Sequence, residues 1–305
     1  MPLFNDMMMN RSRSSGLPIG LFAGGVTSVV VATTEKYTYS GDTVASGTSL
    51  TEARYRFAAT STTSVGYFAA GYNASSVQQS TMYRYTYSGD IVSSGTGLTT
   101  ARYALAGAGS LSAGYFSGGY VGGTAQTLTQ KYTYSGDSVT TSTALGTAIG
   151  DHGATSTLTN GYFAGGGSSS STTAVSKYSW ADDTRSAGTA LNQDRRRFGA
   201  SGSRNVGIFM NGITGTSTSL TSSSKYTYSG DTTAAGTGSG VNISDNAATG
   251  TNILGIFIGG SIAGGPASQG YKYTYIGDTV VASTNLGTAR YWHTAAGSSP
   301  GAFVS

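Results

Sequence analysis

Short segments of alternating apolar and small residues, each bounded by glycine, serine or aspartate, recur along the whole chain. Residues 101–145 contain four of them: an alanine-rich piece, Gly114-Tyr-Phe-Ser-Gly-Gly119, Lys131-Tyr-Thr-Tyr134, and a Ser/Thr-rich piece that ends at Leu145. Pieces with this length and these boundaries are typical of strands joined by turns. We therefore predict four strands in this unit and name them a, b, c and d in chain order.

The same unit occurs six times. Strand c carries Lys-Tyr-Thr-Tyr-Ser-Gly-Asp or a close variant, and subtracting the positions of its first tyrosine gives steps of 46 to 48 residues. A fixed period of about 40–50 residues is typical of propeller blades. The sequence thus predicts an all-β fold, a six-bladed β-propeller of four-stranded antiparallel blades. The first tyrosines are Tyr37, Tyr85, Tyr132, Tyr178, Tyr226 and Tyr273.

The two ends of the repeat complement each other. The chain enters at strand b of the first blade, Leu21-Phe-Ala-Gly-Gly25, and the missing strand a comes last, within Arg290-Tyr-Trp-His-Thr-Ala-Ala296. We expect this C-terminal strand to complete the first blade and close the ring, which removes exposed sheet edges. Residues 17–305 then form the propeller and residues 1–16 an N-terminal arm. Gly301-Ala-Phe-Val-Ser305 resembles a further strand b for which the ring has no place.

The side chains of the repeat are graded in size. Strand a carries mainly Ala, Gly, Ser and Thr, which suit the crowded axis where blades converge. The tyrosine pairs of strand c suit the wider space farther out, where their hydroxyls can reach water or a backbone partner.

The Ser-Gly-Asp between strands c and d predicts a tight hairpin. Its glycine, for example Gly136, is expected to take a positive φ, which glycine adopts without a steric clash. Its aspartate, for example Asp137, is expected to bond to nearby backbone. One aspartate per blade cannot converge with the others on one cation, and calcium takes six or more oxygen ligands. We therefore predict no metal site, and nothing in the chain indicates a cofactor.

Composition narrows the classes of function. Charged residues are 10% of the 305 residues, the net charge is +4, and the arginines are dispersed. A nucleic-acid interface needs a clustered basic face, so none is predicted. No run approaches the roughly 18 apolar residues of a membrane span, and the chain does not start like a signal peptide. We expect neither membrane insertion nor ordinary secretion. Cysteine is absent, which excludes a disulfide framework.

Two resemblances follow from these motifs. An arginine followed by alanine near strand a, an aromatic residue before Gly-Gly, a tyrosine strand and an outer strand resemble the kelch-type propeller repeat over residues 17–305. The chain departs from that pattern because Trp180 lies on strand c, whereas kelch repeats usually carry tryptophan on the outer strand. The Gly-Tyr-Phe-x-Gly-Gly, Lys-Tyr-Thr-Tyr-Ser-Gly-Asp and Thr-Ala-Arg-Tyr segments also resemble propeller repeats in tail and other virion proteins of bacteriophages, including those that infect cyanobacteria.

Departures from the repeat indicate where function lies. The c–d turns hardly vary between copies, whereas the b–c loops vary most, and the b–c and d–a loops of a propeller share one face. Because loops on a rigid scaffold often carry recognition, this is the predicted binding face. Its candidate residues are two b–c tyrosines and five residues at one variable d–a position: Tyr72, Tyr120, Arg56, Asp151, Arg197, Asp245 and Trp292.

Neighbouring d–a positions favour structural roles. Two residues before the variable position, an arginine recurs in four copies, and we expect it to cap carbonyl groups or stack on tyrosine. His152 and His293 occupy a mostly apolar position, and the kelch-type resemblance implies a packed role for them too. The recurring arginines are Arg54, Arg102, Arg195 and Arg290.

No catalytic residue is predicted. Glycoside hydrolysis requires two carboxylates about 5–10 Å apart. Glu52, Asp151, Asp194 and Asp245 can all point toward the variable face, but they belong to different blades. A glycan hydrolase is therefore the least favoured alternative.

The phage resemblance and the apolar arm together suggest a virion protein. An apolar patch often marks an interface, and the candidate anchors are Leu3, Phe4, Met7, Met8 and Met9. We expect a non-enzymatic bacteriophage virion structural protein, a tail-fibre or other appendage propeller. Its partners would be other virion proteins through the arm and a host-surface glycan or receptor through the variable face. An equal alternative is that it decorates the particle without binding a receptor. Such a particle is assembled in the host cytoplasm and then acts outside the cell. The alternatives are a cellular carbohydrate-binding lectin and a kelch-like protein-interaction module.

Overall fold

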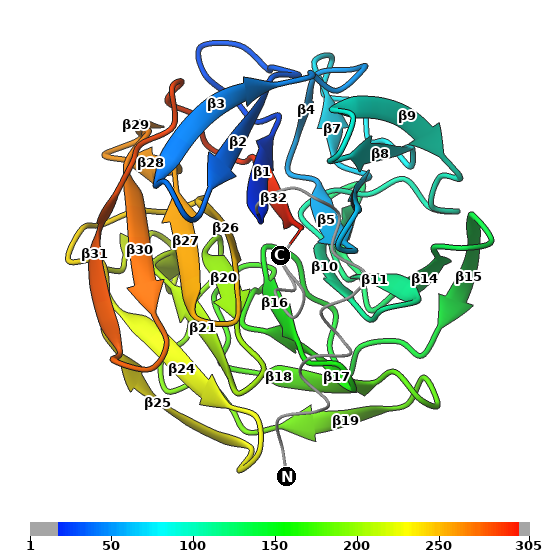
Figure 1. Ribbon diagram of the computed structural model, residues 1–305. Helices are drawn as coiled ribbons and strands as arrows, with labels where there is room; N and C mark the ends of the chain where they lie inside the picture. Colours follow the sequence, from blue (N-terminus) through cyan, green and yellow to red (C-terminus); the bar gives the residue numbers. More distant parts are fainter. Residues whose placement is uncertain (1–17, 299–305) are drawn as a thin grey trace, which may run out of the picture.

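A computed structural model describes residues 18–298. Six four-stranded antiparallel sheets surround a central axis, which confirms the six-bladed β-propeller (Figure 1). The part of the chain that the structure describes contains no helical segment with the length and apolar character of a membrane span.

The inner two strands of each blade are short and buried. The innermost strands, which correspond to strand a, are β5 (Ala58–Ser61), β10 (Ala106–Gly109), β16 (Gly153–Ser156), β20 (Gly199–Gly202), β26 (Ala247–Gly250) and β32 (Thr294–Gly297). The second strands, which correspond to strand b, are β1 (Ile19–Ala23), β6 (Val65–Ala69), β11 (Ala113–Ser117), β17 (Asn160–Ala164), β21 (Val206–Met210) and β27 (Leu254–Ile258).

The outer two strands carry the repeated tyrosines and the exposed rim. The third strands are β2 (Thr34–Thr38), β8 (Met82–Thr86), β14 (Thr129–Thr133), β18 (Val175–Ser179), β24 (Ser223–Thr227) and β30 (Gly270–Thr274). The outermost strands are β3 (Thr43–Gly47), β9 (Ile91–Gly95), β15 (Ser138–Ser142), β19 (Arg185–Gly188), β25 (Thr232–Gly236) and β31 (Thr279–Ser283).

Short two-residue strands extend the b–c loops and d–a junctions at one end of blades 2, 3, 5 and 6. They are β4 (Arg54–Tyr55), β7 (Tyr72–Asn73), β12 (Tyr120–Val121), β13 (Thr124–Ala125), β22 (Ile213–Thr214), β23 (Thr218–Ser219), β28 (Ser261–Ile262) and β29 (Gly265–Pro266).

The ring closes as the sequence predicts. The last strand, β32, pairs antiparallel with β1 from Gly20↔Gly297 to Ala23↔Thr294. The Ile19 amide donates to Ser298 Oγ at 2.8 Å, so both ends of the described chain lie at the a–b end of blade 1. Strand β1 therefore occupies the position of strand b in this blade. The strand-like tail 301–305 lies outside the described residues, as does the arm 1–16.

The axis is packed as tightly as its small residues indicate. All four residues of each innermost strand are buried. A Cβ atom placed on Gly107 would lie 2.2 Å from the carbonyl oxygen of Ala59 in the preceding blade. A larger side chain at Gly107 would therefore have to push two blades apart.

The c–d turns correct one prediction. The positive φ belongs to the aspartate and not to the glycine: Asp137 has φ 44°, and all six equivalent aspartates lie between 44° and 57°, whereas Gly136 does not take a positive φ. Aspartate tolerates this left-handed conformation better than most residues. The six are Asp42, Asp90, Asp137, Asp183, Asp231 and Asp278.

The reason for the aspartate is a bond to the neighbouring blade. Asp137 Oδ1 accepts the Thr96 amide of the preceding blade at 2.8 Å and the hydroxyl of Tyr132 in its own blade. Its other oxygen lies 3.6 Å from Arg84 of the preceding blade. Equivalent amide bonds join four further blade pairs through Asp90, Asp231, Asp278 and Asp42.

The second tyrosines also join blades, at smaller radius. The Tyr134 hydroxyl lies 2.9 Å from Thr60 Oγ1, and the Tyr275 hydroxyl lies 2.8 Å from Ser201 Oγ, in each case in the preceding blade. Burial raises the pKa of both tyrosines well above its usual value, so they stay protonated. We expected these hydroxyls to reach water or backbone, and their partners are side-chain hydroxyls.

We predict that Asp137→Ala lowers the free energy of unfolding by about 1 kcal/mol, less than the roughly 1.5–3 kcal/mol of a charged hydrogen bond, because this side chain is 39% exposed and its charge is screened by water. The bonds from Tyr132 and Thr96 hold the Asp137 pKa below its usual value. A depressed pKa stabilises the fold above the unfolded-state pKa of about 3.9, and this contribution disappears as pH falls through the folded pKa. Urea unfolding should show a difference at pH 6 that shrinks below about pH 4.

The control for this experiment is Ser135→Ala, an exposed position in the same turn. It should stay within about 0.5 kcal/mol of the parent protein. A pH-independent difference for Asp137→Ala would contradict the charged bond to the neighbouring blade.

Candidate functional site

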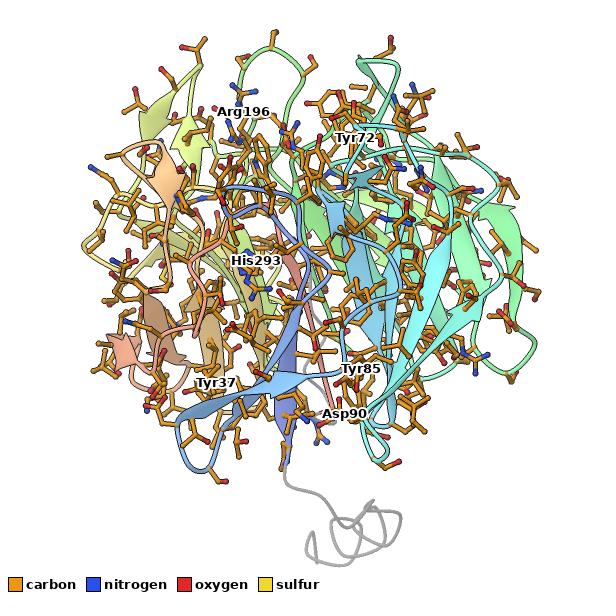
Figure 2. All side chains as sticks on the ribbon, turned by 90° about the horizontal axis from the view of Figure 1, so that it is seen from above. Tyr37, Tyr72, Tyr85, Asp90, Arg196 and His293 are labelled. Atoms are coloured by element: carbon orange, nitrogen blue, oxygen red, sulfur yellow. The ribbon has the colours of Figure 1, made fainter. Side chains whose placement is uncertain are left out.

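The predicted binding face lies at one end of the propeller. Figure 2 shows Tyr72 and Arg196 at this end, Asp90 at the other, and His293 between them. Across the face, each described d–a junction is bridged to the b–c loop of its own blade, as in the pairs Tyr55–Tyr72 and Tyr103–Tyr120. These bridges fix the loops to the ring, so the face is a rigid surface.

Backbone groups form a closed ring at the centre of this face. The amide of Ala104 donates to the Arg56 carbonyl at 2.7 Å, and the same bond recurs from blade to blade until the Arg56 amide meets the Trp292 carbonyl at 2.9 Å. All six residues of this axial ring have φ between 52° and 58°. They are Arg56, Ala104, Asp151, Arg197, Asp245 and Trp292.

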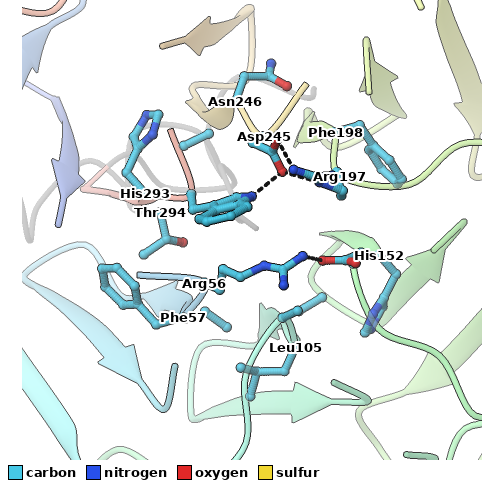
Figure 3. Close-up of a pocket in the computed structure, with 16 residues that line it drawn as sticks. Arg56, Phe57, Leu105, His152, Arg197, Phe198, Asp245, Asn246, His293 and Thr294 are labelled. Atoms are coloured by element: carbon cyan, nitrogen blue, oxygen red, sulfur yellow. Dashed lines mark hydrogen bonds and ion pairs between the residues drawn. The ribbon is translucent and has the colours of Figure 1, made fainter. Parts of the chain in front are cut away.

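The side chains of the axial ring satisfy one another. Arg56 Nη2 lies 2.8 Å from Asp151 Oδ1 across the axis. Arg197 donates two bonds to the Asp245 carboxylate, at 2.6 and 2.7 Å, and Trp292 Nε1 donates to the same carboxylate at 2.6 Å (Figure 3). This position therefore varies between blades in a complementary way, with two arginines facing two aspartates.

The tryptophan is covered on its ring faces. The Arg56 guanidinium lies 4.8 Å and that of Arg197 5.5 Å from the Trp292 ring. Tyr55 stacks on the same indole at 5.7 Å. Cations over an indole are held by its quadrupole, so Trp292 is a fixed part of the face.

A hollow of about 90 Å³ lies inside the ring. Sites for organic ligands are typically about 300–1,000 Å³, so this hollow suits a few water molecules. Burial raises the pKa of Asp151, opposed by the charge of Arg56. Behind the ring lie the two histidines, packed as predicted against phenylalanine: His152 on Phe163 and His293 on Phe22. Burial lowers the pKa of both to about 3, so they are neutral.

Stacked aromatic residues, which we call the aromatic ladder, cross blades 1 to 3. Ring centroids are 5.3 Å apart for Tyr55–Tyr72, 4.2 Å for Tyr72–Tyr103 and 5.2 Å for Tyr103–Tyr120. The Tyr120 ring fills the space that a side chain at Gly150 would need, 2.1 Å from an added Cβ. The ladder consists of Trp292, Tyr55, Tyr72, Tyr103 and Tyr120.

The ladder changes what Tyr72 and Tyr120 can do. Tyr72 is stacked on both sides, and Tyr120 lies between Tyr103 and Gly150, so their ring faces are not open to a sugar. Burial raises the pKa of both to about 12, so both keep their hydroxyl protons. The Tyr120 hydroxyl donates to the Gly167 carbonyl. The ladder therefore offers ring edges on a pre-organised surface.

The four carboxylates that sequence reasoning weighed for hydrolysis are all on this face and all engaged. Besides the two in the axial ring, Glu52 pairs with Arg54 at 2.6 Å, and Asp194 accepts bonds from Thr214 and Ser171. Among residues 18–298, no group of His, Asp or Glu is arranged to hold a metal ion.

The recurring arginines are buried and structural, as predicted. Arg102 is fully buried and donates to the carbonyls of Gly118, Leu128 and Phe116. Arg54, Arg195 and Arg290 cap carbonyls in the same way.

Sequence reasoning missed three residues of this face: Tyr55 and Tyr103 in the ladder, and Arg196. Each directly precedes a member of the axial ring, so the repeat alignment that singled out Arg56 also contained them.

A scan against protein-family models finds no family that matches the chain. A search of curated proteins also finds no match.

We predict that Asp245→Ala lowers the free energy of unfolding by about 3 kcal/mol. The carboxylate is buried, and its removal leaves Arg197 and the Trp292 N–H without their acceptor. Thermal or urea unfolding measures the loss, and in a Trp180→Phe background the Trp292 fluorescence should shift to the red. Asp182→Ala, at an exposed acid on the other face, is the control and should leave both unchanged. Equal behaviour of the two variants would show that the axial contacts contribute nothing.

Proposed function

We propose that this protein is a non-enzymatic structural protein of a bacteriophage virion, a tail-fibre or other appendage propeller. In this proposal the b–c/d–a face is displayed toward the host surface, and the opposite face, with the arm, is held by the particle.

The observation that carries the proposal is the position of the chain ends. Ile19 and Ser298 are bonded to each other at the a–b end of blade 1, on the face opposite the axial ring and the aromatic ladder. The described chain therefore begins, at Pro18, on the side away from the variable loops. A protein attached through this arm would turn its variable face outward.

The character of the variable face favours binding over catalysis. Tyrosine, tryptophan and arginine are the residues enriched at binding hot spots, and the aromatic ladder and axial ring consist mainly of them. The carboxylates on this face are held by arginines or by several hydrogen bonds, and the axial hollow has room for little more than water. A ligand would contact this face from outside.

The ligand we propose is a host-surface glycan or protein receptor. Because the ring faces of the ladder are covered, recognition would use aromatic ring edges, the remaining donors of Arg56 and the polar b–c loops. This mode departs from the stacked sugar platform of many lectins. The proposal also rests on the resemblance of the repeat segments to kelch-type repeats and to the propeller repeats of phage virion proteins.

Deletion of residues 1–16 tests the attachment. We expect it to abolish incorporation into the particle while the propeller still folds, because the arm precedes the first strand. Incorporation is measured by immunoblotting of purified particles against a full-length control. Normal incorporation of the shortened chain would reject the arm as the anchor.

Tyr72→Ala tests recognition. Tyr72 is central in the ladder, so its removal should weaken binding of the protein to host cells or to a glycan array by at least about tenfold, the factor that corresponds to 1.4 kcal/mol. Ile276→Ser, at a fully exposed residue of the opposite face, is the matched control and should bind normally. Equal binding by both variants would exclude the ladder from recognition, and product release from host polysaccharide would overturn the non-enzymatic assignment.

A further inference from the structure

Large apolar side chains are exposed mainly on the face opposite the candidate site. Among the described residues, every exposed leucine and isoleucine lies in an a–b turn or at a c–d turn, whereas elsewhere only valines are exposed. The most exposed is Ile276, at 90%. Single exposed apolar residues are normal, but a group on one face indicates an interface. The group consists of Ile91, Leu111, Leu158, Ile253 and Ile276.

Two of these residues border a hollow between blades 3 and 4. Leu111 and Leu158 occupy the same position in neighbouring a–b turns, where the turns of other blades carry Thr, Arg or Asn. The hollow between them has a volume of about 330 Å³. Trp180 and Ala181 also line it, together with the polar residues Ser110, Ser112, Thr159, Asn160 and Ser179. We call its apolar part, Leu111, Leu158, Trp180 and Ala181, the apolar notch.

The notch is preformed. The Trp180 ring stacks on Tyr115 with centroids 4.4 Å apart, and its Nε1 donates to the Thr157 carbonyl at 3.1 Å. Because the only polar atom of the indole side chain is satisfied internally, the ring offers the notch an apolar surface. Trp180 and Ala181 replace the Tyr and Ser of the repeat. Three large apolar departures from the six-fold pattern, Leu111, Leu158 and Trp180, therefore meet at one place.

We propose that the apolar notch binds the apolar segment of the chain's own N-terminal arm, Leu3, Phe4 and Met7 to Met9. The arm lies outside the described residues, but its attachment point at Pro18 is on the same face as the notch. An extended chain spans about 3.3 Å per residue, so the nine residues from Met9 to Pro18 reach roughly 30 Å. A domain of this size has a radius of gyration of about 19 Å. The segment can therefore reach the notch of its own propeller.

The chemistry of the segment matches the notch. Methionine is unbranched and fills irregular gaps, and its sulfur makes favourable contacts with aromatic rings such as that of Trp180. Seating the segment removes Leu111, Leu158 and the indole from water. This inference goes beyond the proposed function, because it holds whatever the variable face binds. It yields one composite docking face, in which the arm covers the notch.

Trp180 reports directly on the occupant. The chain has two tryptophans, so a full-length Trp292→Phe protein leaves Trp180 as the single emitter. Replacing the five apolar arm residues by serine in this background should shift the Trp180 emission to the red and increase its quenching by acrylamide. Hydrogen exchange of residues 110–113 and 157–160, measured without the Trp292 change, should become faster. Unchanged emission, quenching and exchange would overturn the proposal.

Two matched variants locate the contact. Leu158→Ser, in the notch, should reproduce the effect of the arm substitutions, whereas Ile253→Ser, equally apolar and outside the notch, should not. An equal effect of the two would overturn the assignment to the notch. Light scattering should show the same mass with and without the apolar arm residues. A mass that falls when they are replaced would mean that the arm binds a second copy, which also contradicts docking on its own propeller. Loss of particle incorporation with an unchanged Trp180 signal would retain the proposed function and reject only this inference.

Discussion

The axial ring of backbone hydrogen bonds is the constraint on which the rest of the propeller depends. Every blade turns an edge strand toward the axis, and buried N–H and C=O groups without partners cost free energy. At the mouth of the axis each amide meets the carbonyl of the preceding blade, and this geometry recurs six times with φ between 52° and 58°. The last hydrogen bond of this cycle joins the Arg56 amide to the Trp292 carbonyl. The hydrogen-bond ring therefore closes where the C-terminal segment closes the ring of blades.

The same ring explains why its side chains differ so widely. Pairing through the backbone leaves the side chain free, except that a β-branched residue at positive φ is strongly disfavoured, and none of the six is β-branched. That freedom is used for contacts between blades, where Arg56 pairs with Asp151 two blades away and Arg197 pairs with Asp245 of the next blade. The variable position of the axial ring was interpreted from the sequence as facing solvent or a ligand. In the structure its arginines and aspartates also balance one another's charge at the mouth of the axis.

Properties repeated six times could be predicted from the sequence, and properties of contacts between blades could not. The period and the alternation of residues sufficed for blade number, strand order and closure by the C-terminal strand. The positive φ was wrongly given to Gly136; the aspartate that adopts it, Asp137, also accepts an amide of the preceding blade, a contact that no local pattern reveals. Tyr72 and Tyr120 were found as misfits in the repeat, but their stacking with Tyr55 and Tyr103 depends on neighbouring loops that no local pattern reveals.

The two faces depart from the repeat in chemically different ways. On the b–c/d–a face the departures are charged and aromatic, and they pair with one another. A ligand of the kind we propose would therefore meet a pre-organised surface and cost it little entropy. On the a–b/c–d face the departures are apolar, and Leu111 and Leu158 remain in contact with water until something covers them. Selective contact suits the first face and stable attachment the second. Since the described part of the chain begins and ends on the second face, near Ile19 and Ser298, attachment there would leave the first face free.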